Sequence, residues 1–332
     1  MTDMTAIVPI DLSQRPMDII QKALRLASAA EIANVRIVFG HNDTRSLPDK
    51  LFKILLRKYK KTSVVSGHYY TEHVNSSLLR NRAFEDVSTP YLILLDVDIW
   101  PDFEILKKYR DRLKEVGASY YFLPCLYLTA SGSRSLTSKK LTTQELKARF
   151  FNFSRKEFLH LASPSSVTVM RSTDYRLLGG FDEGYTGHGY EDFDFLIRLA
   201  VHHKRLQPRE DTLADRPARS PLFAVGFRKY LGEQCLDALL EKDFVYHIFH
   251  KKPKTSRYYS ARPSNYVRFA EQHATLVCTD TAGDKSLITQ FTEACALSNL
   301  DVSEYSILFD NKPGHIDRFD TFKRRLRFLL ND

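Results

Sequence analysis

Four short apolar segments alternate with segments of helical periodicity in the first hundred residues, and this order limits the possible folds more than any other feature. The apolar segments, which we expect to be strands, are 5–9, 35–43, 63–67 and 90–98. The segments expected to be helices are 17–33, 51–59 and 75–87. A chain that alternates strands with helices forms a mostly parallel sheet with helices on both faces. The sequence therefore predicts an α/β fold.

Polar residues end two of the predicted strands. Asn42 and Asp43 end the second strand, and Asp96 and Asp98 end the fourth. In parallel α/β sheets, ligands bind outside the carboxyl ends of the strands, near a switch in strand order. We therefore expect a binding site at this edge of the sheet.

The second half of the chain has a less regular pattern. Strands are expected at 120–128, 166–170 and 244–249, and loops at 131–149 and 206–222. From about residue 265 onward the pattern is mainly helical.

The composition is that of a globular protein, with 43% hydrophobic and 27% charged residues among 332. The net charge of +9 favours anionic partners such as phosphate-bearing donors or lipid surfaces, although solubility alone explains it as well. No nucleic-acid motif is present, so no nucleic-acid partner is expected. Four cysteines without CxxC spacing predict free thiols and argue against a structural zinc site.

The start of the chain lacks the pattern of a signal peptide, and no apolar run reaches the roughly 20 residues that span a bilayer. We therefore expect a cytoplasmic protein, either soluble or peripheral on a membrane.

The segment Asp96-Val97-Asp98 follows the apolar run YLILL. Side chains two apart in an extended segment project to the same side. Buried carboxylates need a compensating cation, and oxygen ligands at this spacing suit Mn²⁺ or Mg²⁺. The alternative interpretation is two solvated acids in a loop.

A second candidate segment, 187–194, places two glycines before three carboxylates, Glu191, Asp192 and Asp194. The apolar residues that follow predict that the carboxylates begin a helix, where the helix dipole favours negative charge. A carboxylate beside an acceptor hydroxyl is what general-base catalysis requires. The alternative is simple capping of the helix by these acids.

A third candidate contains His247 and His250, which leave a predicted strand. Residues three apart in an extended segment face opposite sides, so we expect only one of them to bind a metal. The alternative is a structural histidine. Three lysines follow that could face phosphates: Lys251, Lys252 and Lys254.

Together and in this order, these segments resemble the GT-A glycosyltransferases of the β-1,4-galactosyltransferase and bacterial family 2 type, including chondroitin-polymerase-like modules. The resemblance covers about residues 7–268, and its markers are AIVPI, SSLLRNRAFEDVSTPYLILLDVD, GGFDEGYTGHGYEDFDFLIRL and HIFHKK. It implies a GT-A (Rossmann-like) catalytic domain over residues 1–268. The nucleotide-sugar half would cover about 1–105 and the acceptor half about 106–268, before a helical C-terminal extension over 269–332.

The resemblance also implies roles for individual residues. Asp98 would bind the metal directly, and Asp96 would lie nearer the ribose and sugar of the donor. His247 would complete the metal site, with His250 as the alternative. Asp192 would be the catalytic base. The remaining positions implied are Glu191 for a sugar contact, Arg80 and Arg82 on the helix that meets the nucleotide, and Pro9, Asn42 and Asp43 for the uracil and ribose.

Gly187 and His188 fall on the part of the family pattern that shapes the sugar pocket. His188 stands where the family has tryptophan, and Tyr190 stands where it has glycine. The sugar specificity of the family is therefore not carried over to this chain.

The implied activity is an inverting, metal-dependent transfer from a nucleotide-sugar, with a UDP-sugar favoured, to a glycan hydroxyl in bacterial surface polysaccharide synthesis. The segment 316–330 has apolar residues at helical spacing with basic residues around them. Such a helix can lie on an anionic membrane, which would suit a lipid-linked acceptor on the inner face. An ordinary helix packed on the domain fits this segment equally well.

Two other functions compete with this interpretation. A haloacid-dehalogenase-type phosphatase also carries a DxD after an apolar strand, but the residues after Asp98 (Ile99, Trp100 and Pro101) do not fit its usual turn. A catalytically inactive GT-A module that binds glycans is the second alternative.

Overall fold

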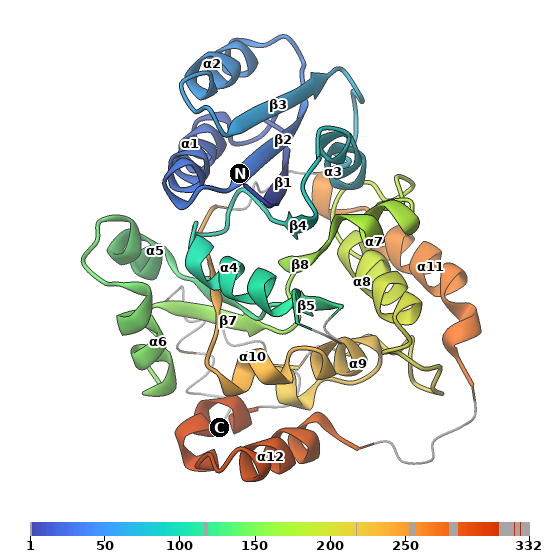
Figure 1. Cartoon of the computed structure of the whole chain (residues 1–332). Coiled ribbons are helices and arrows are strands. Elements are labelled where there is room, and N and C mark those ends of the chain that lie inside the picture. The colour runs from blue at the N-terminus through green and yellow to red at the C-terminus, as the bar shows by residue number, and fades with distance from the viewer. Residues whose placement is uncertain are drawn as a thin grey trace. The chain divides into compact units, whose positions relative to one another are not determined.

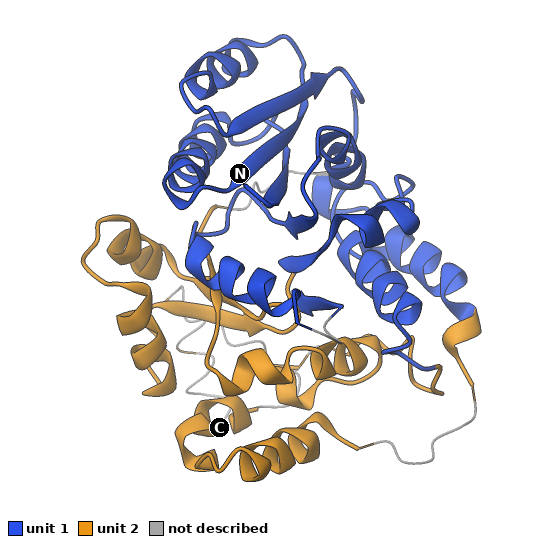
Figure 2. Cartoon of the chain, viewed as in Figure 1, with its two compact units in different colours: residues 1–121, 166–207, 252–274 blue, residues 122–165, 208–251, 275–332 orange. Residues whose placement is uncertain are grey.

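The computed structural model describes residues 2–115, 119–216, 218–251, 257–278 and 285–311, together with Phe322 and Leu326. The chain forms two compact units that interleave along the sequence (Figure 2). Unit 1 contains residues 1–121, 166–207 and 252–274, and unit 2 contains residues 122–165, 208–251 and 275–332. The boundary of the catalytic domain at residue 268 remains a prediction. The division of that domain into two halves at about residue 105 also remains a prediction.

Unit 1 is built on a six-stranded sheet in the order β3-β2-β1-β4-β8-β5, of which the last residue of β5 is counted with unit 2 (Figure 1). The strands are β1 (Met4–Ile10), β2 (Arg36–Asn42), β3 (Thr62–Gly67), β4 (Tyr91–Leu94), β5 (Tyr120–Phe122) and β8 (Thr168–Arg171). Strands β1 to β4 run parallel, whereas β8 is antiparallel to β4. The predicted α/β fold with a mostly parallel sheet is confirmed.

The helices of unit 1 begin and end with recognisable local signals. They are α1 (Pro16–Ala33), α2 (Leu47–Leu56), α3 (Ser76–Phe84), α4 (Phe103–Arg112), α7 (Ser172–Leu177), α8 (Glu191–His202), α11 (Arg262–Gln272) and the 3-10 turn η2 (Arg257–Tyr259). A further turn, η3 (Ala274–Leu276), lies at the boundary of the units. Ser46 and Asp49 form a capping box on α2, and Asn34 ends α1 in the left-handed conformation.

Helix α3 packs against β1 and β2, on the side of these strands opposite to α1 and α2 (Figure 1). The approach is close because Gly40 on β2 has no side chain. A Cβ atom at Gly40 would lie 1.8 Å from the carbonyl oxygen of Leu79 on α3. This contact fixes the height of α3 above the sheet and therefore the position of the next residue on the helix, Arg80.

Unit 2 holds a three-stranded sheet in the order β7-β6-β9. Its strands are β6 (Cys125–Leu128), β7 (Phe158–Ala162) and β9 (Val245–His247), with β6 antiparallel to β7 and parallel to β9. The described helices and turns of the unit are α5 (Ala130–Thr137), α6 (Thr143–Phe151), η1 (Pro221–Phe223), α9 (Phe227–Glu233), α10 (Leu236–Leu240), α12 (Leu287–Leu297) and η4 (Val302–Phe309).

The structure corrects the predictions for part of this second half. The loop predicted at 131–149 is wrong, since α5 and α6 occupy most of it and Thr142 with Glu145 forms a capping box on α6. Exposed polar residues on short helices hid the periodicity. The single strand predicted at 120–128 is two strands, β5 and β6, and β7 was not predicted at all.

The basic amphipathic helix predicted at 316–330 lies outside the described residues, apart from Phe322 and Leu326, which are both exposed. Over the part of the chain that the structure describes, no helix combines the length and the apolar character needed to cross a membrane.

The contact at Gly40 yields a stability prediction. Gly40→Ala should destabilise the protein by about 2 kcal/mol or more, because the backbone of α3 must shift. Gly179→Ala is the control, since its φ of +71° strains a side chain but nothing lies within 4 Å of the added Cβ. The control should cost about 1 kcal/mol. Urea unfolding measures both, and equal losses would contradict the close packing of α3.

Candidate functional site

Arg80 on α3 joins two of the carboxylates that the sequence singled out. Its Nη2 donates a hydrogen bond of 2.6 Å to Asp96 Oδ1, and its Nη1 lies 3.2 Å from Asp192 Oδ1. Arg80 is only 2% exposed, and its guanidinium lies over the ring of Phe181. Burial lowers the pKa of Arg80, but Asp192, Asp96 and Glu191 together raise it above its ordinary value. The arginine is therefore a fixed positive charge between the end of β4 and the start of α8.

Asp96 is held from two sides. Its second oxygen, Oδ2, accepts a hydrogen bond of 2.7 Å from Ser166 Oγ, just before β8. About a third of the side chain is still exposed, so a ligand can reach it.

Glu191 and Asp192 form the first turn of α8, after Tyr190, whose φ is +73°. Burial and the charge of Asp192 raise the pKa of Glu191, against the opposing effect of Arg80. Burial also raises the pKa of Asp192 to about 6, while Arg80 lowers it and Asp96 raises it. Within the described part of the chain, Glu191 Oε2 is buried and lacks a hydrogen-bond partner. A buried carboxylate oxygen of this kind is a natural contact for a polar ligand.

Asp98 is more deeply buried than Asp96 and meets a different set of cations. Arg15 Nη2 donates to Asp98 Oδ2 at 2.9 Å, and Lys22 Nζ donates to Oδ1 at 2.7 Å. Arg15 directly precedes α1, and Lys22 lies on the buried side of the same helix. The two cations neutralise a carboxylate that burial would otherwise penalise.

The extended geometry predicted for Asp96 and Asp98 is wrong. Strand β4 ends at Leu94, and residues 97–98 form a turn in which Ile99 N–H donates to the carbonyl of Asp96. The two carboxylates consequently have different partners, Arg80 and Ser166 for one and Arg15 and Lys22 for the other.

The residues predicted to contact the nucleotide lie in different environments in the structure. Pro9 lies in β1 opposite Gly40. Asn42 is buried, and its side chain accepts hydrogen bonds from the backbone N–H groups of Tyr69 and Tyr70, which gives it a structural role.

Two further residues of the predicted nucleotide site pair with neighbours of their own. Asp43 pairs with Lys53 of α2, and this hydrogen bond holds the pKa of Asp43 below its usual value. Arg82 pairs with Glu85 at 2.6 Å on an exposed part of α3, so it does not join the cluster around Arg80.

Gly187 and His188 lie in the loop before α8. Gly187 has a φ of +68°, and a Cβ atom there would lie 2.7 Å from the carbonyl oxygen of Tyr258. The backbone N–H of His188 donates to that same oxygen, and the imidazole lies beside the rings of Tyr258 and Tyr259. The glycine therefore allows this loop to close onto η2. Asp194 is buried and paired with Arg198 and His273, which fits a structural role.

The two candidate histidines belong to unit 2. His247 ends β9, and its ring stacks on Tyr127 with 4.2 Å between ring centres. The expectation that His247 and His250 face opposite sides is wrong, because the strand ends at His247 and the two rings lie 5.4 Å apart.

A family model described as "Glycosyltransferase like family 2" matches residues 48–273, more than half of the chain. The matched range includes Arg80, Asp96 and Asp192. The chain belongs to the glycosyltransferase family 2-like proteins. The resemblance to family 2 glycosyltransferases, drawn from the sequence motifs, is thereby confirmed.

Solved structures of two glycosyltransferases are similar to this one. The catalytic domain of Drosophila beta1,4-galactosyltransferase 7 in complex with xylobiose is 15% identical, over 61% of this chain and 63% of that chain, with a TM-score of 0.33. S. aureus TarS 1–349 is 13% identical, over 60% of this chain and 55% of that chain, with a TM-score of 0.38. The chain therefore spans less than two thirds of the length of either structure. No curated protein matches it significantly.

Sequence reasoning missed three polar residues of the site: Arg15, Lys22 and Ser166. One signal was available for Lys22, because it falls among Ile19, Ile20 and Ala23 on the apolar side of a predicted helix. A lysine on a buried face usually has an acidic partner. Ser166 carries no such signal, since only the fold brings it next to Asp96.

The raised pKa of Glu191 predicts how stability depends on pH. A carboxyl group whose pKa is higher in the folded state stabilises the protein at low pH, and this contribution is lost as pH rises. For Glu191 this stabilisation is lost between pH 4.5, the ordinary pKa of a glutamate, and a pH of about 8, the pKa of Glu191 in the folded protein. Glu191→Gln should therefore raise the melting temperature at pH 9 by roughly 3–6 °C. The variant should also show a smaller decrease of melting temperature than the wild type as pH rises from 5 to 8.

Glu271→Gln is the control, since Glu271 is an exposed glutamate of the same unit. It should leave the pH profile of the melting temperature unchanged. A Glu191→Gln variant that follows the wild-type profile would show that Glu191 ionises normally.

Proposed function

We propose that this glycosyltransferase catalyses an inverting, divalent-metal-dependent transfer of a sugar from a nucleotide-sugar, with a UDP-sugar favoured, to a glycan hydroxyl. The observation that carries the proposal is the arrangement of Asp96, Arg80 and Asp192. A carboxylate at the carboxyl end of a parallel strand and a carboxylate at a helix start share one buried guanidinium. Donor binding and proton removal can therefore be coupled within a few ångströms.

Asp192 is the proposed catalytic base. It takes the proton from the acceptor hydroxyl as that oxygen attacks the anomeric carbon from the face opposite the leaving diphosphate. A base works best when its pKa lies near the working pH, and a pKa of about 6 suits this task better than that of an ordinary aspartate. Arg80 keeps the base ionised at neutral pH and directs its carboxylate.

Glu191 is the proposed sugar contact. Its pKa is raised further than that of Asp192, so it keeps its proton at a pH where Asp192 has lost its own. Two adjacent carboxyl groups with separate pKa values can act as a hydrogen-bond donor and a base respectively. The protonated Glu191 would donate a hydrogen bond to a sugar hydroxyl.

The oxygen donors Asp96 and Asp98 fit Mn²⁺ or Mg²⁺ in chemistry. Such an ion would neutralise the charge that develops on the leaving phosphate. Asp98 already accepts from Arg15 and Lys22, so these cations would have to share the carboxylate with the ion. We retain His247 as a further proposed ligand, with His250 as the alternative.

Pro9, Asn42, Asp43 and Arg82 remain proposed contacts around the nucleotide, and Gly187 and His188 around the sugars. Because the side chain of Asn42 is hydrogen-bonded to the backbone, its proposed role is to shape the wall of the nucleotide pocket. Lipid-linked acceptors, surface polysaccharide synthesis and a place on the inner face of the cell membrane are proposed on the resemblance and the charge of +9.

Of the competing functions, the phosphatase is disfavoured by the family to which the chain belongs. The inactive glycan-binding module is disfavoured, because the acid-base pair Glu191 and Asp192 and the arginine between the carboxylates are intact.

Asp192→Asn should lower the rate of sugar transfer by roughly 10³-fold or more, because the amide cannot accept the proton. Donor affinity should change less than about threefold, since the amide keeps the shape of the side chain. Asp182→Asn is the matched control and should retain most activity, because Asp182 lies in the segment before α8 and is paired with Arg268. Steady-state kinetics together with donor titration measure both effects. Substantial transfer by Asp192→Asn would refute the assignment of the base.

Metal and donor use can be tested by melting temperature. S. aureus TarS has been solved with UDP-GlcNAc and the Drosophila enzyme with manganese and UDP-Gal, which makes these compounds suitable probes. We expect Mn²⁺ and a UDP-sugar together to raise the melting temperature more than either does alone, because ligands that bind the folded state stabilise it.

The shift should be lost in Asp98→Asn and kept in Asp111→Asn, an exposed acid on α4. GDP- and CMP-sugars serve as the comparison donors. An equal shift with and without Mn²⁺ would show that Arg15 and Lys22 replace the metal.

A further inference from the structure

Helix α2 has apolar residues on two opposite sides, and only one of these sides is covered. Phe52 and Leu56 on the covered side are buried. On the other side, Leu47 is 79% exposed, Leu51 37% and Ile54 57%. Residues spaced four and then three apart lie in one row along a helix. Leu47, Leu51 and Ile54 therefore form a continuous exposed row, which we call the α2 stripe.

The segment that contains the α2 stripe is strongly basic. Residues 45–61 hold seven basic residues and one acidic residue, a net charge of +6, compared with +9 for the whole chain. The one acid, Asp49, is buried, and its Oδ1 lies 3.0 Å from Nε2 of His41, so it adds no negative charge to the surface. Five of the seven basic residues are exposed: Arg45, Lys50, Arg57, Lys58 and Lys60.

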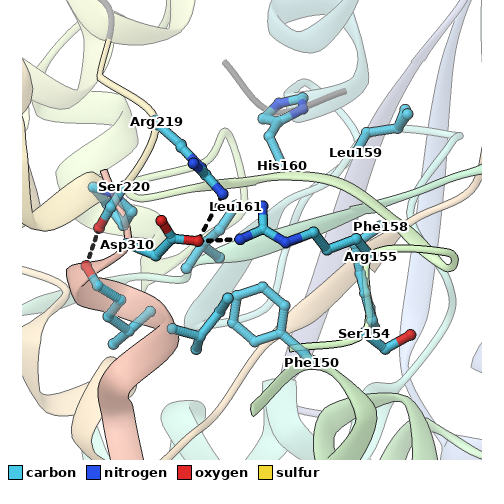
Figure 3. Close-up of a pocket in the computed structure, with 13 residues that line it drawn as sticks. Phe150, Ser154, Arg155, Phe158, Leu159, His160, Leu161, Arg219, Ser220 and Asp310 are labelled. Atoms are coloured by element: carbon cyan, nitrogen blue, oxygen red, sulfur yellow. Dashed lines mark hydrogen bonds and ion pairs between the residues drawn. The ribbon is translucent and has the colours of Figure 1, made fainter. Parts of the chain in front are cut away.

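The exposed cations around the α2 stripe have no acidic partner among the residues that the structure describes. Of the seven basic residues, only the half-buried Lys53 pairs with a described carboxylate, that of Asp43. Unit 2 shows the opposite arrangement, since Arg155 and Arg219 both donate to Asp310 (Figure 3). The positive charge beside the α2 stripe can therefore act on an anionic partner.

An exposed apolar row bordered by cations fits a membrane surface better than other partners. At an anionic bilayer, apolar side chains enter the boundary of the acyl chains while lysine and arginine stay among the head groups. A second copy of the chain, docked through the same face, would bring like charges against one another. Nucleic acid would engage the cations but leave the apolar row without a partner.

We propose that α2 is a docking surface for an anionic lipid bilayer, with the α2 stripe at the acyl boundary and the flanking cations against lipid phosphates. Lys50 and Arg57 each follow a member of the stripe by three residues, which places them beside it on the helix surface. Figure 1 shows α2 beside β3, the edge strand of the sheet, whereas the proposed chemistry lies at β4 and α8.

This inference rests on the membrane location given under the proposed function and names the surface responsible for it. It does not depend on the proton transfer at Asp192. Vesicle binding is measured without donor or metal, and transfer is assayed with a soluble acceptor. A chain that binds vesicles but transfers no sugar would contradict only the transfer, and the reverse result would contradict only the docking surface.

Sedimentation of lipid vesicles with the full chain measures the binding directly. We expect at least about tenfold stronger binding to phosphatidylcholine vesicles that contain phosphatidylglycerol than to phosphatidylcholine alone, because the cations need anionic head groups. The preference should shrink at high salt, which screens those charges. No binding to the anionic vesicles, or equal binding to both kinds, overturns the proposal.

Leu47→Ser combined with Ile54→Ser should weaken binding to the anionic vesicles by about tenfold, because it removes most of the exposed apolar row. The matched control combines Leu177→Ser with Val267→Ser, two exposed apolar residues elsewhere in unit 1, and should bind as the wild type does. Thermal melting verifies that both variants fold. Equal binding by the two double variants overturns the proposal.

Lys50→Gln combined with Arg57→Gln should also weaken binding by about tenfold, because each cation near an anionic surface contributes to affinity. Lys139→Gln combined with Lys140→Gln removes the same charge from an exposed part of unit 2 and is the matched control. Equal losses in the two pairs would show attraction by the net charge alone and overturn docking at α2.

Sedimentation velocity without lipid tests the competing occupant of the same face. We expect the wild type to stay monomeric through this face, so that its sedimentation equals that of the Leu47→Ser, Ile54→Ser variant. A concentration-dependent dimer that this variant abolishes would assign the α2 stripe to a second copy of the chain and overturn the proposal.

Discussion

The buried guanidinium of Arg80 is the interaction on which the rest of the site depends. A charge at 2% exposure is tolerated only when opposite charges and hydrogen bonds compensate for lost hydration. Asp96 and Asp192 supply that compensation, and although one follows β4 and the other lies in the first turn of α8, almost a hundred residues apart in sequence, both meet the same guanidinium. The close contact of α3 with Gly40 sets where the guanidinium lies. Fold stability and the position of the proposed catalytic base are therefore linked through one side chain.

The same charge also explains why neighbouring carboxyl groups differ. Asp192 faces Arg80 directly, and its pKa is raised less than that of Glu191, for which burial and the adjacent Asp192 dominate. Asp98 accepts hydrogen bonds from two other cations, Arg15 just before α1 and Lys22 on α1. Each acid thus has its own electrostatic environment, as enzymes require when similar side chains perform different tasks.

The alternation of apolar and amphipathic segments was enough to predict the parallel strands of unit 1, because β1, β2 and β4 are buried on both faces and therefore consist of nearly continuous apolar residues. It failed at 131–149, where α5 and α6 are short and rich in polar residues. The candidate acids could be identified because Asp96 and Asp192 sit at element ends that sequence patterns mark well. Two partners of the predicted acids could not be identified, because Ser166 reaches Asp96, and Arg15 reaches Asp98, only through the fold. The hydrogen bonds that the backbone N–H groups of Tyr69 and Tyr70 donate to the side chain of Asn42 could not be predicted for the same reason.

The central claim is that Arg80 and Asp192 act as one electrostatic unit. The most direct measurement is a carbon-13 NMR titration of the Asp192 carboxyl group in the wild type and in Arg80→Gln, with thermal melting to verify folding. The account predicts an elevated pKa in the wild type, near 6, and a further rise in the variant, because the charge that favours the carboxylate is gone. An Asp192 pKa that is unchanged or lower in Arg80→Gln would contradict the account.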